Sequence, residues 1–256
     1  MVYSYEVTLL ILCPLIFLAA FIDSIAGGGG LISLPAYIFA GLPIHTAAGT
    51  NKFSSSIGTA AAVVNYTRGG CVDFSAAAAG GSGALIGSWM GTRLALSLSP
   101  MILQICLMVI LPLALIFALS GRGAGKAQIK DPPPFKLKLI LSGLIGLILG
   151  SYDGFFGPGT GMFMTLALSG LIRLDLIKAV GTTKVLNFSS NIASVVTWLV
   201  NGKILFPIAI PCAVCSVAGG FLGSRMAMKT GKKFIRVILA LVAILLFIKI
   251  LLDLIK

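Results

Sequence analysis

Long apolar segments, separated by short polar stretches, fill most of this 256-residue chain. A helix needs about 20 apolar residues to cross the hydrocarbon layer of a membrane. Eight segments have a suitable length: 7–24, 46–66, 73–95, 100–120, 138–155, 176–200, 204–227 and 233–254. Two further apolar segments, 31–42 and 160–172, are too short to cross alone. The alternation of apolar and polar residues that a β-barrel needs is absent from the sequence, so the pattern predicts an all-α integral membrane protein with eight to ten membrane-embedded helices.

Composition supports a membrane protein. Charged residues make up 10% of the chain, hydrophobic residues 58%, and the mean hydropathy is +1.07. A soluble domain has about 25% charged residues. The net charge of +12 would suggest a nucleic-acid partner in a soluble protein, but here the basic residues gather at predicted helix ends. We therefore expect the lipid bilayer as a partner and no nucleic acid.

Two glycine-rich interruptions, at 26–30 and 157–161, follow apolar segments at matching places. Each leads to a Gly-Thr-x-Lys motif, at 49–52 and 181–184. When residue 49 is aligned with residue 181, the two halves match without a gap from residue 27 to about residue 113. The sequence therefore predicts a tandem duplication: a first transmembrane repeat (1–120), a polar cytoplasmic linker (121–137) and a second transmembrane repeat (138–256). Since glycine costs a helix about 1 kcal/mol, two matching runs need a reason, and paired broken helices around one site are typical of secondary transporters.

Basic residues indicate the orientation of the repeats, because loops rich in Lys and Arg stay cytoplasmic. They form two clusters: Arg122, Lys126, Lys130, Lys136 and Lys138, and then Arg225, Lys229, Lys232, Lys233 and Arg236. If all ten segments cross, both clusters face the cytoplasm and the halves are inverted repeats. If 31–42 and 160–172 are re-entrant, eight segments cross, the halves are parallel and the clusters face opposite sides. We favour inversion because it obeys the charge rule.

Four charged residues lie inside the apolar segments: Asp23, Lys52, Asp153 and Lys184. Charges are costly inside a membrane and mark function by default. One interpretation is that they form two buried Asp–Lys pairs that hold the halves together. Another is that the lysines bind a substrate, and the two interpretations can coexist. Asp23 and Asp153 are also candidates for carrying coupling protons, since burial favours the neutral form of a carboxyl group.

The helices that begin after the glycine breaks indicate an anion site. A helix start carries unpaired N–H groups and the positive end of the helix dipole. We expect a midplane site that binds a small oxyanion through both breaks and the starts of the following helices. The predicted substrate-binding residues are Gly28, Gly29, Gly30, Thr50, Asn51, Lys52, Gly159, Thr160, Gly161, Thr182, Thr183, Lys184, Asn187 and Asn191. We also expect the polar side chains of Ser54, Ser55, Ser56 and Thr59 to line a cavity.

Enzymatic function is not predicted. The single histidine has no partner motif, and the sequence contains no metal-binding cluster and calls for no cofactor. The run 27–30 is no nucleotide fingerprint, because no strand precedes it. Two other functions stay open: a passive anion channel with the same site, and an ion-pair scaffold without transport.

The duplicated glycine break and the Ala-x-Gly-Thr-x-Lys motif resemble the sulfite exporter TauE/SafE family, also called the toluene sulfonate uptake permease family. The matching pieces are 27–30 with Pro35, 47–52, 154–161, and 179–184 with Asn187 and Asn191. The resemblance covers nearly the whole chain. Ala167 departs from the pattern where a proline matching Pro35 would be expected. The two short segments are therefore expected to bend differently.

This resemblance implies a secondary transporter that exports a small anion by alternating access. The family is linked to sulfite, sulfonates, sulfoacetate and related anions, so a sulfur oxyanion is the expected substrate. The expected location is the inner (cytoplasmic) membrane of a prokaryotic cell, as a multi-pass protein with its basic loops in the cytoplasm. A homodimer is compatible with a chain of this size.

Overall fold

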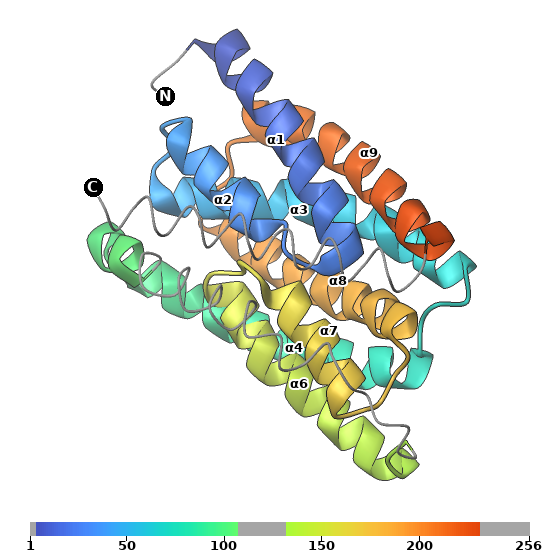
Figure 1. Ribbon diagram of the computed structural model, residues 1–256. Coiled ribbons are helices and arrows are strands. Elements are labelled where there is room, and N and C mark those ends of the chain that lie inside the picture. Colours follow the sequence, from blue (N-terminus) through green and yellow to red (C-terminus); the bar gives the residue numbers. More distant parts are fainter. Residues whose placement is uncertain (1–3, 107–131, 231–256) are drawn as a thin grey trace, which may run out of the picture.

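The computed structural model describes residues 4–106 and 132–230, and no strand occurs within these ranges, which confirms the all-α prediction. Eight helices have full bounds, and residues 100–106 begin a further helical segment. The helices are α1 (Tyr5–Ala26), α2 (Gly30–Phe39), α3 (Ile44–Arg68), α4 (Phe74–Ser97), α6 (Phe135–Phe155), α7 (Thr160–Gly170), α8 (Leu176–Val200) and α9 (Phe206–Thr230) (Figure 1).

Some predictions fall wholly or partly on residues outside the described ranges. These are the segments 100–120 and 233–254, the linker 121–137, and the basic residues Arg122, Lys126, Lys130, Lys232, Lys233 and Arg236. They stay predictions.

Three of the described helices, α1, α6 and α9, are long and apolar enough to cross a membrane by length and composition. The helices α3, α4 and α8 have a similar length of 24 or 25 residues but carry more Ser, Thr, Asn and Gly. Many of these polar side chains are buried inside the bundle rather than on its surface. The less apolar helices therefore form the interior of a membrane protein.

The glycine breaks end helices because their backbone turns left-handed. Gly27 follows α1 with φ of 79°, and its N–H donates to the carbonyl of Asp23 at 2.7 Å. Gly157 and Gly159, between α6 and α7, have φ of 87° and 81°. Side chains disfavour this region, so glycine is required at these turns.

Each break is the tip of a helical hairpin, α1–α2 or α6–α7, and the two tips meet at the centre of the molecule (Figure 1). The amide of Met162 donates to the carbonyl of Gly27 at 3.1 Å, and a Cβ on Gly27 would lie 2.2 Å from the carbonyl carbon of Gly161. The returning helices have 10 and 11 residues, or about 15 Å each at 1.5 Å per residue. Each returning helix therefore spans about half of a membrane.

Helices α3 and α8 cross at the centre in antiparallel directions. Gly49, near the start of α3, lies against Trp198 at the end of α8, and Gly181, near the start of α8, lies against Tyr66 at the end of α3. A Cβ added to either glycine would lie 3.2 Å from the Cβ of its aromatic neighbour. The glycine of each Gly-Thr-x-Lys motif thus permits this close crossing.

Small residues bring the outer helices together. A Cβ on Gly87 or Gly91 of α4 would lie 2.1 Å or 2.0 Å from a carbonyl oxygen of α6. Gly219 and Gly223 of α9 contact α1 in the same way, at 2.3 Å and 2.4 Å. These glycines serve helix packing, as small residues at four-residue spacing usually do in membranes. Helix α4 of the first half is therefore packed along α6, and helix α9 of the second half along α1.

The number of residues that separates matching positions of the two halves is not the same along the whole repeat. The alignment of residue 49 with residue 181 also superimposes the start of α3 on that of α8, and the start of α4 on that of α9. The starts of α2 and α7 match only when the offset is two positions smaller, and this smaller offset also aligns Asp23 with Asp153. The gapless alignment is therefore wrong across the breaks, because the second half is longer by two positions between its break and α8. The residue that matches Pro35 is Thr165, rather than Ala167.

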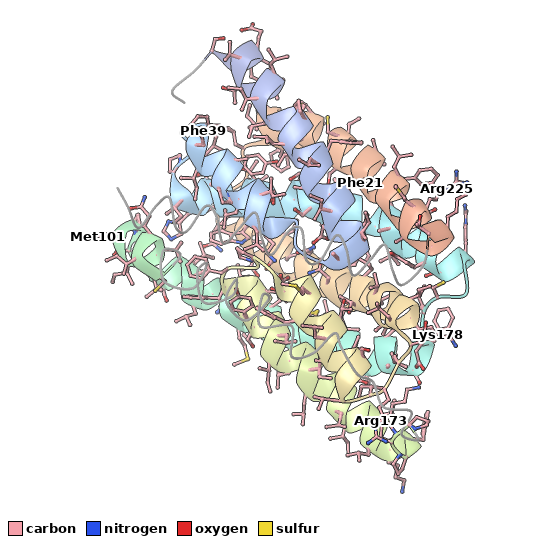
Figure 2. All side chains as sticks on the ribbon, viewed as in Figure 1. Phe21, Phe39, Met101, Arg173, Lys178 and Arg225 are labelled. Carbon is pink, nitrogen blue, oxygen red and sulfur yellow. The ribbon has the colours of Figure 1, made fainter. Side chains whose placement is uncertain are left out.

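Basic side chains gather at one end of the bundle. In Figure 2, Arg173, Lys178 and Arg225 lie at the same end, opposite Phe39 and Met101. The helix ends at this side also carry the remaining members of the group: Arg68, Lys136, Lys138 and Lys229. Among the described residues outside the centre, only Arg93 and Lys203 lie toward the other end. The charge is thus strongly asymmetric along the bundle.

Candidate functional site

Two ion pairs lie at the centre, and each joins the halves. Lys52 Nζ of α3 lies 2.7 Å from Asp153 Oδ2 of α6, and Lys184 Nζ of α8 lies 2.7 Å from Asp23 Oδ2 of α1. Each lysine therefore pairs with the acid of the opposite half. This confirms that the four charges form two Asp–Lys pairs between the halves, although the side chain of Asp23 is partly exposed, and it leaves a further role in transport open.

The pair of Lys52 and Asp153 is enclosed by polar neighbours from α8. Their side chains are 8% and 2% exposed. Lys52 also donates to Asn191 Oδ1 at 3.0 Å, and the hydroxyl of Ser190 donates to Asp153 Oδ2. These hydrogen bonds satisfy charges that would otherwise be costly to bury.

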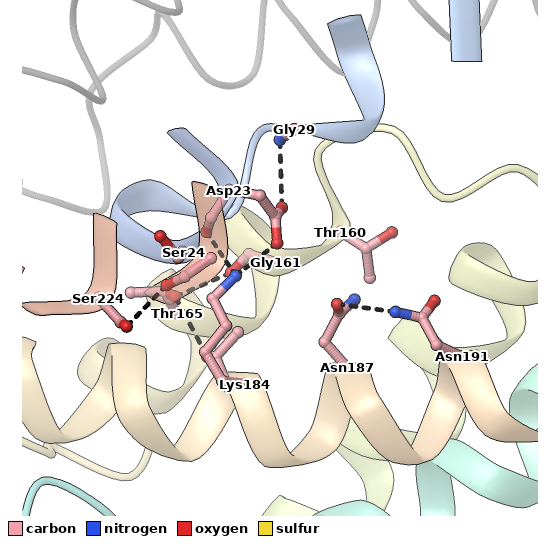
Figure 3. A network of polar contacts seen from close by, with 12 residues as sticks. Asp23, Ser24, Gly29, Thr160, Gly161, Thr165, Lys184, Asn187, Asn191 and Ser224 are labelled. Carbon is pink, nitrogen blue, oxygen red and sulfur yellow. Dashed lines mark hydrogen bonds and ion pairs between the residues drawn. The ribbon is translucent and has the colours of Figure 1, made fainter. Parts of the chain in front are cut away.

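The pair of Lys184 and Asp23 links two helix ends. Lys184 donates to both the carboxylate and the backbone carbonyl of Asp23, in the last turn of α1 (Figure 3). Asp23 Oδ1 accepts from the amide of Gly29, which precedes α2, at 3.1 Å. A cation is thus placed at a helix C-terminus and an anion at a helix N-terminus, as the helix dipoles favour.

The threonines of the repeated motifs bind loops of the opposite half. Thr50 Oγ1 accepts from the amide of Leu205 at 3.1 Å, and Thr182 Oγ1 accepts from the amide of Asp73 at 3.0 Å. Leu205 and Asp73 hold matching positions before α9 and α4. Both threonines are fully buried, so their hydroxyls position the α3–α8 crossing against the neighbouring helices.

A cavity of about 40 Å³ lies where the glycine breaks meet α3 and α8. A single water needs roughly 10–15 Å³, so the cavity suits a group of a few heavy atoms. Nine predicted site residues line it: Asp23, Gly29, Gly30, Asn51, Lys52, Asp153, Gly161, Asn187 and Asn191. These come from both halves, and Figure 3 shows Asn187 and Asn191 on the same side of α8. Their side chains are linked by a hydrogen bond of 3.3 Å.

Seven other predicted residues do not line this cavity: Gly28, Thr50, Gly159, Thr160, Thr182, Thr183 and Lys184. Thr160 donates to the carbonyl of Gly157 at 2.8 Å, and Thr183 accepts from Thr165 at 3.1 Å. Gly159 adopts the left-handed turn before α7. The structure therefore gives several of these residues internal partners.

Hydroxyl groups complete the wall of the cavity. Ser55 and Thr59 line it as the polar pattern of α3 predicts, whereas Ser54 bonds to Tyr37 at 2.8 Å. Ser56 does not line the cavity either, and it donates to the carbonyl of Phe53 at 2.8 Å.

Sequence reasoning missed three serines of the wall, Ser24, Ser33 and Ser216. Ser24 follows Asp23 just before the glycine break, whereas Ser33 and Ser216 stand in apolar stretches without a repeated motif, so only the helix packing reveals them.

The charges at the centre cancel, because two lysines face two aspartates. Lys52 is nevertheless in the wall of the cavity beside the amides of Asn187 and Asn191. Ammonium and amide groups donate hydrogen bonds to oxyanions. Within the described residues, no group of three His, Cys, Asp or Glu side chains could hold a metal ion. The arrangement is chemically suited to a small polar or anionic solute.

Comparison with known proteins agrees with this architecture. Residues 12–250 match the family model described as Sulfite exporter TauE/SafE. A probable membrane transporter protein of a Sinorhizobium species is 37% identical, over 93% of this chain and 90% of the relative. One of Haemophilus influenzae is 36% identical, over 93% of this chain and 92% of the relative. The probable membrane transporter YfcA of Escherichia coli is 32% identical, over 92% of this chain and 87% of the relative.

No solved structure matches the chain. The family match covers most of the sequence, and relatives above 30% identity are covered over nearly their whole length. The chain therefore belongs to the sulfite exporter TauE/SafE family and is a membrane transporter.

Proposed function

We propose that this transporter exports a small sulfur oxyanion, such as sulfite or a sulfonate, across the inner membrane of a prokaryotic cell by alternating access. The observation that carries the proposal is the Lys52 ammonium in the wall of a cavity between the two glycine breaks. Asn187 and Asn191 add amide groups from the opposite half. The volume of about 40 Å³ suits an anion of a few heavy atoms. The sulfur chemistry and the outward direction come from the family, which is described as a family of sulfite exporters.

Inverted halves belong to the same proposal. The matching helices α3 and α8 are antiparallel, and the hairpins α1–α2 and α6–α7 approach the centre from opposite sides (Figure 1). A hairpin that returns to the side on which it begins adds no crossing, so α1 and α6 are not counted as crossings here, unlike in the alternative with eight crossing segments. With the segments 100–120 and 233–254 as the proposed third crossings after α4 and α9, each half crosses three times, and an odd number inverts the repeat.

The orientation follows from charge. Seven described Lys and Arg residues lie at one end of the bundle, and we propose that this end faces the cytoplasm. Substrate would then reach the central cavity alternately from the two sides, as the halves rock around it.

The test is anion binding to the purified protein, followed by flux in proteoliposomes. A panel of sulfite, sulfate, thiosulfate, methanesulfonate, sulfoacetate and acetate is screened by thermal shift, since a ligand of the folded state raises its melting temperature. We expect one sulfur oxyanion to stabilise the protein. The double variant Lys52→Met with Asp153→Asn should lose this effect without leaving an unpaired charge. Lys203→Met, outside the cavity, is the control and should keep it.

Flux distinguishes a transporter from a channel. We expect uptake into proteoliposomes to saturate with the stabilising anion and to show counterflow against unlabelled anion inside. Flux without saturation or counterflow would indicate a passive channel. If no anion of the panel shifts the melting temperature or crosses, the proposed substrate class is wrong.

A further inference from the structure

We propose that the two central ion pairs have different functions. In this division Lys52 binds the anionic group of the substrate, and Asp23 takes up the proton that compensates the charge of that substrate. Asp153 and Lys184 are positioning residues that hold these two groups. The proposal rests on the proposed function, since it assigns roles within an anion transporter.

Lys52 lines the cavity, and its ammonium group uses only two of its three N–H donors for contacts within the described structure. An ammonium group carries three N–H donors. In the described structure two of them are directed at Asp153 and Asn191, at 2.7 Å and 3.0 Å. The side chain lines the cavity. A Cβ on Gly157 would lie 3.2 Å from Nζ, so the missing side chain at Gly157 keeps this approach open.

Lys184 also uses two of its three donors, but it is enclosed by the protein and lies outside the cavity wall. Its side chain is 1% exposed and does not line the cavity, although it occupies the position in α8 that matches Lys52 in α3. It donates to the carboxylate and to the backbone carbonyl of Asp23, so it stabilises the end of α1 as well as the acid. An anion in the cavity would have to displace these contacts to reach it.

The two acids also differ in exposure, but here the member of the Lys184 pair is the more exposed one. The side chain of Asp23 is 23% exposed and lines the cavity, held by the amide of Gly29 and by Lys184. Asp153 is 2% exposed and accepts from both Lys52 and Ser190. A proton can therefore reach Asp23 from the cavity more easily than Asp153.

Charge balance links these two roles. Two lysines and two aspartates sum to zero, so a monovalent anion entering the cavity adds an uncompensated negative charge. Such a charge is costly in a poorly hydrated interior. Protonation of Asp23 restores neutrality and removes a like charge from the same cavity. Anion binding and proton binding should therefore favour each other.

Among the titratable groups that surround the cavity, Asp23 is the one best placed to accept a proton. Lys184 faces it from α8, and Lys52 shares the cavity from α3. The hydroxyl of Tyr66 of α3 lies nearby, but it donates to the carbonyl of Ser24, the residue after Asp23, at 2.8 Å. Asp153 is the remaining titratable side chain of the cavity wall, and among the described residues α2, α7 and α9 add none to that wall.

The decisive measurement is the number of protons taken up when the wild-type protein binds methanesulfonate, whose sulfonate group stays ionised between about pH 5 and pH 8. Calorimetry in two buffers of different ionisation enthalpy gives this number directly. We expect about one proton per anion, and an affinity that falls as pH rises, by up to tenfold per unit. If methanesulfonate is not the stabilising anion, sulfate is the second non-titrating probe.

Two matched double variants then separate the pairs without leaving an isolated charge. Asp23→Asn with Lys184→Met should take up no proton and lose the pH dependence, and it should bind about as weakly as the wild type does at high pH, because the anion then stays uncompensated. Asp23→Asn alone, which keeps Lys184 and mimics the protonated acid, should bind within about tenfold of wild type at low pH and take up no proton. Lys52→Met with Asp153→Asn should bind at least about 100-fold more weakly.

The outcomes distinguish this division of roles from the proposed function. If the wild type binds no anion, the proposed function fails, and the division of roles fails with it. If it binds an anion without taking up a proton, the proposed function stands and the role of Asp23 is refuted. If the variant of the Asp23–Lys184 pair loses binding while the Lys52–Asp153 variant retains it, the roles of the lysines are reversed.

Discussion

The two bundles α4–α6–α8 and α1–α3–α9 are built from matching helices but are packed differently. In the first, Gly146, Gly150 and Gly154 of α6 lie against the backbone of α4, and a Cβ on Gly146 would lie 1.9 Å from the carbonyl oxygen of Gly80. The glycines of α4 contact α6 in return. Glycines from both helices therefore allow the backbones of α4 and α6 to lie in direct contact.

At the matching interface of the second bundle, between α1 and α9, only α9 supplies glycines. The positions of α1 that match Gly146, Gly150 and Gly154 are Ile16, Ala20 and Ser24, and all three line the cavity. Their side chains stand where α6 has glycines, and they form part of the cavity wall instead of a second set of glycine contacts. The two bundles therefore differ in what these three matching positions do: in α6 they pack against α4, and in α1 they line the cavity.

Hydrogen bonds between hydroxyl groups also stabilise α4–α6–α8, which we call the closed bundle, whereas α1–α3–α9 is the open bundle. Ser194 of α8 bonds to Ser88 and Thr92 of α4 at 2.9 Å and 2.6 Å, and Thr92 also donates to the carbonyl of Gly154 at 3.0 Å. The residue of α3 that matches Ser194 is Ala62, which lines the cavity. We interpret α4–α6–α8 as the rigid bundle, and α1–α3–α9 as the one with room for a solute.

The largest expected effect comes from giving α6 the side chain that α1 has. Gly146→Ile should place a side chain into the backbone of α4 and destabilise the protein by more than about 4 kcal/mol. The yield of monodisperse protein by size-exclusion chromatography, and its melting temperature, measure the effect. Gly170→Ile is the control, because nothing lies within 4 Å of a Cβ there. A well-folded Gly146→Ile protein would contradict the close packing of α4 and α6.

A smaller effect is expected when one ion pair is broken. Lys52→Met leaves Asp153 charged and only 2% exposed, which should cost about 3–5 kcal/mol. Adding Asp153→Asn should recover most of this loss, because no buried charge remains. Thermal and chemical unfolding of the single and double variants check the recovery. A double variant that is no more stable than Lys52→Met would show that the pair is not the source of the loss.

The smallest effect concerns the hydroxyl network of the closed bundle. Ser194→Ala should remove the bonds to Ser88 and Thr92 and cost about 1–2 kcal/mol. The matching exchange in the open bundle, Ala62→Ser, should change stability by less than about 0.5 kcal/mol, since it faces the cavity. Unfolding of the two variants side by side measures the difference. Equal effects would remove the distinction between the bundles.

The sequence predicted the helical membrane fold, both glycine breaks and the four central charges. Each of these is a local property, because apolar length, glycine conformation and the cost of burying charge act at the residue itself. It also paired the motifs at 49–52 and 181–184 correctly, since the offset between them is the one that superimposes α3 on α8.

Only the tertiary structure decided which groups meet. The antiparallel crossing of α3 and α8 places Lys52 beside Asp153 and Lys184 beside Asp23, and it turns Thr50 and Thr182 toward loops of the opposite half. It also brings Ser33 and Ser216 to the cavity, although nothing in their apolar surroundings marks them. Contacts between residues far apart in the chain depend on how the helices cross, and a local pattern carries no information about that crossing.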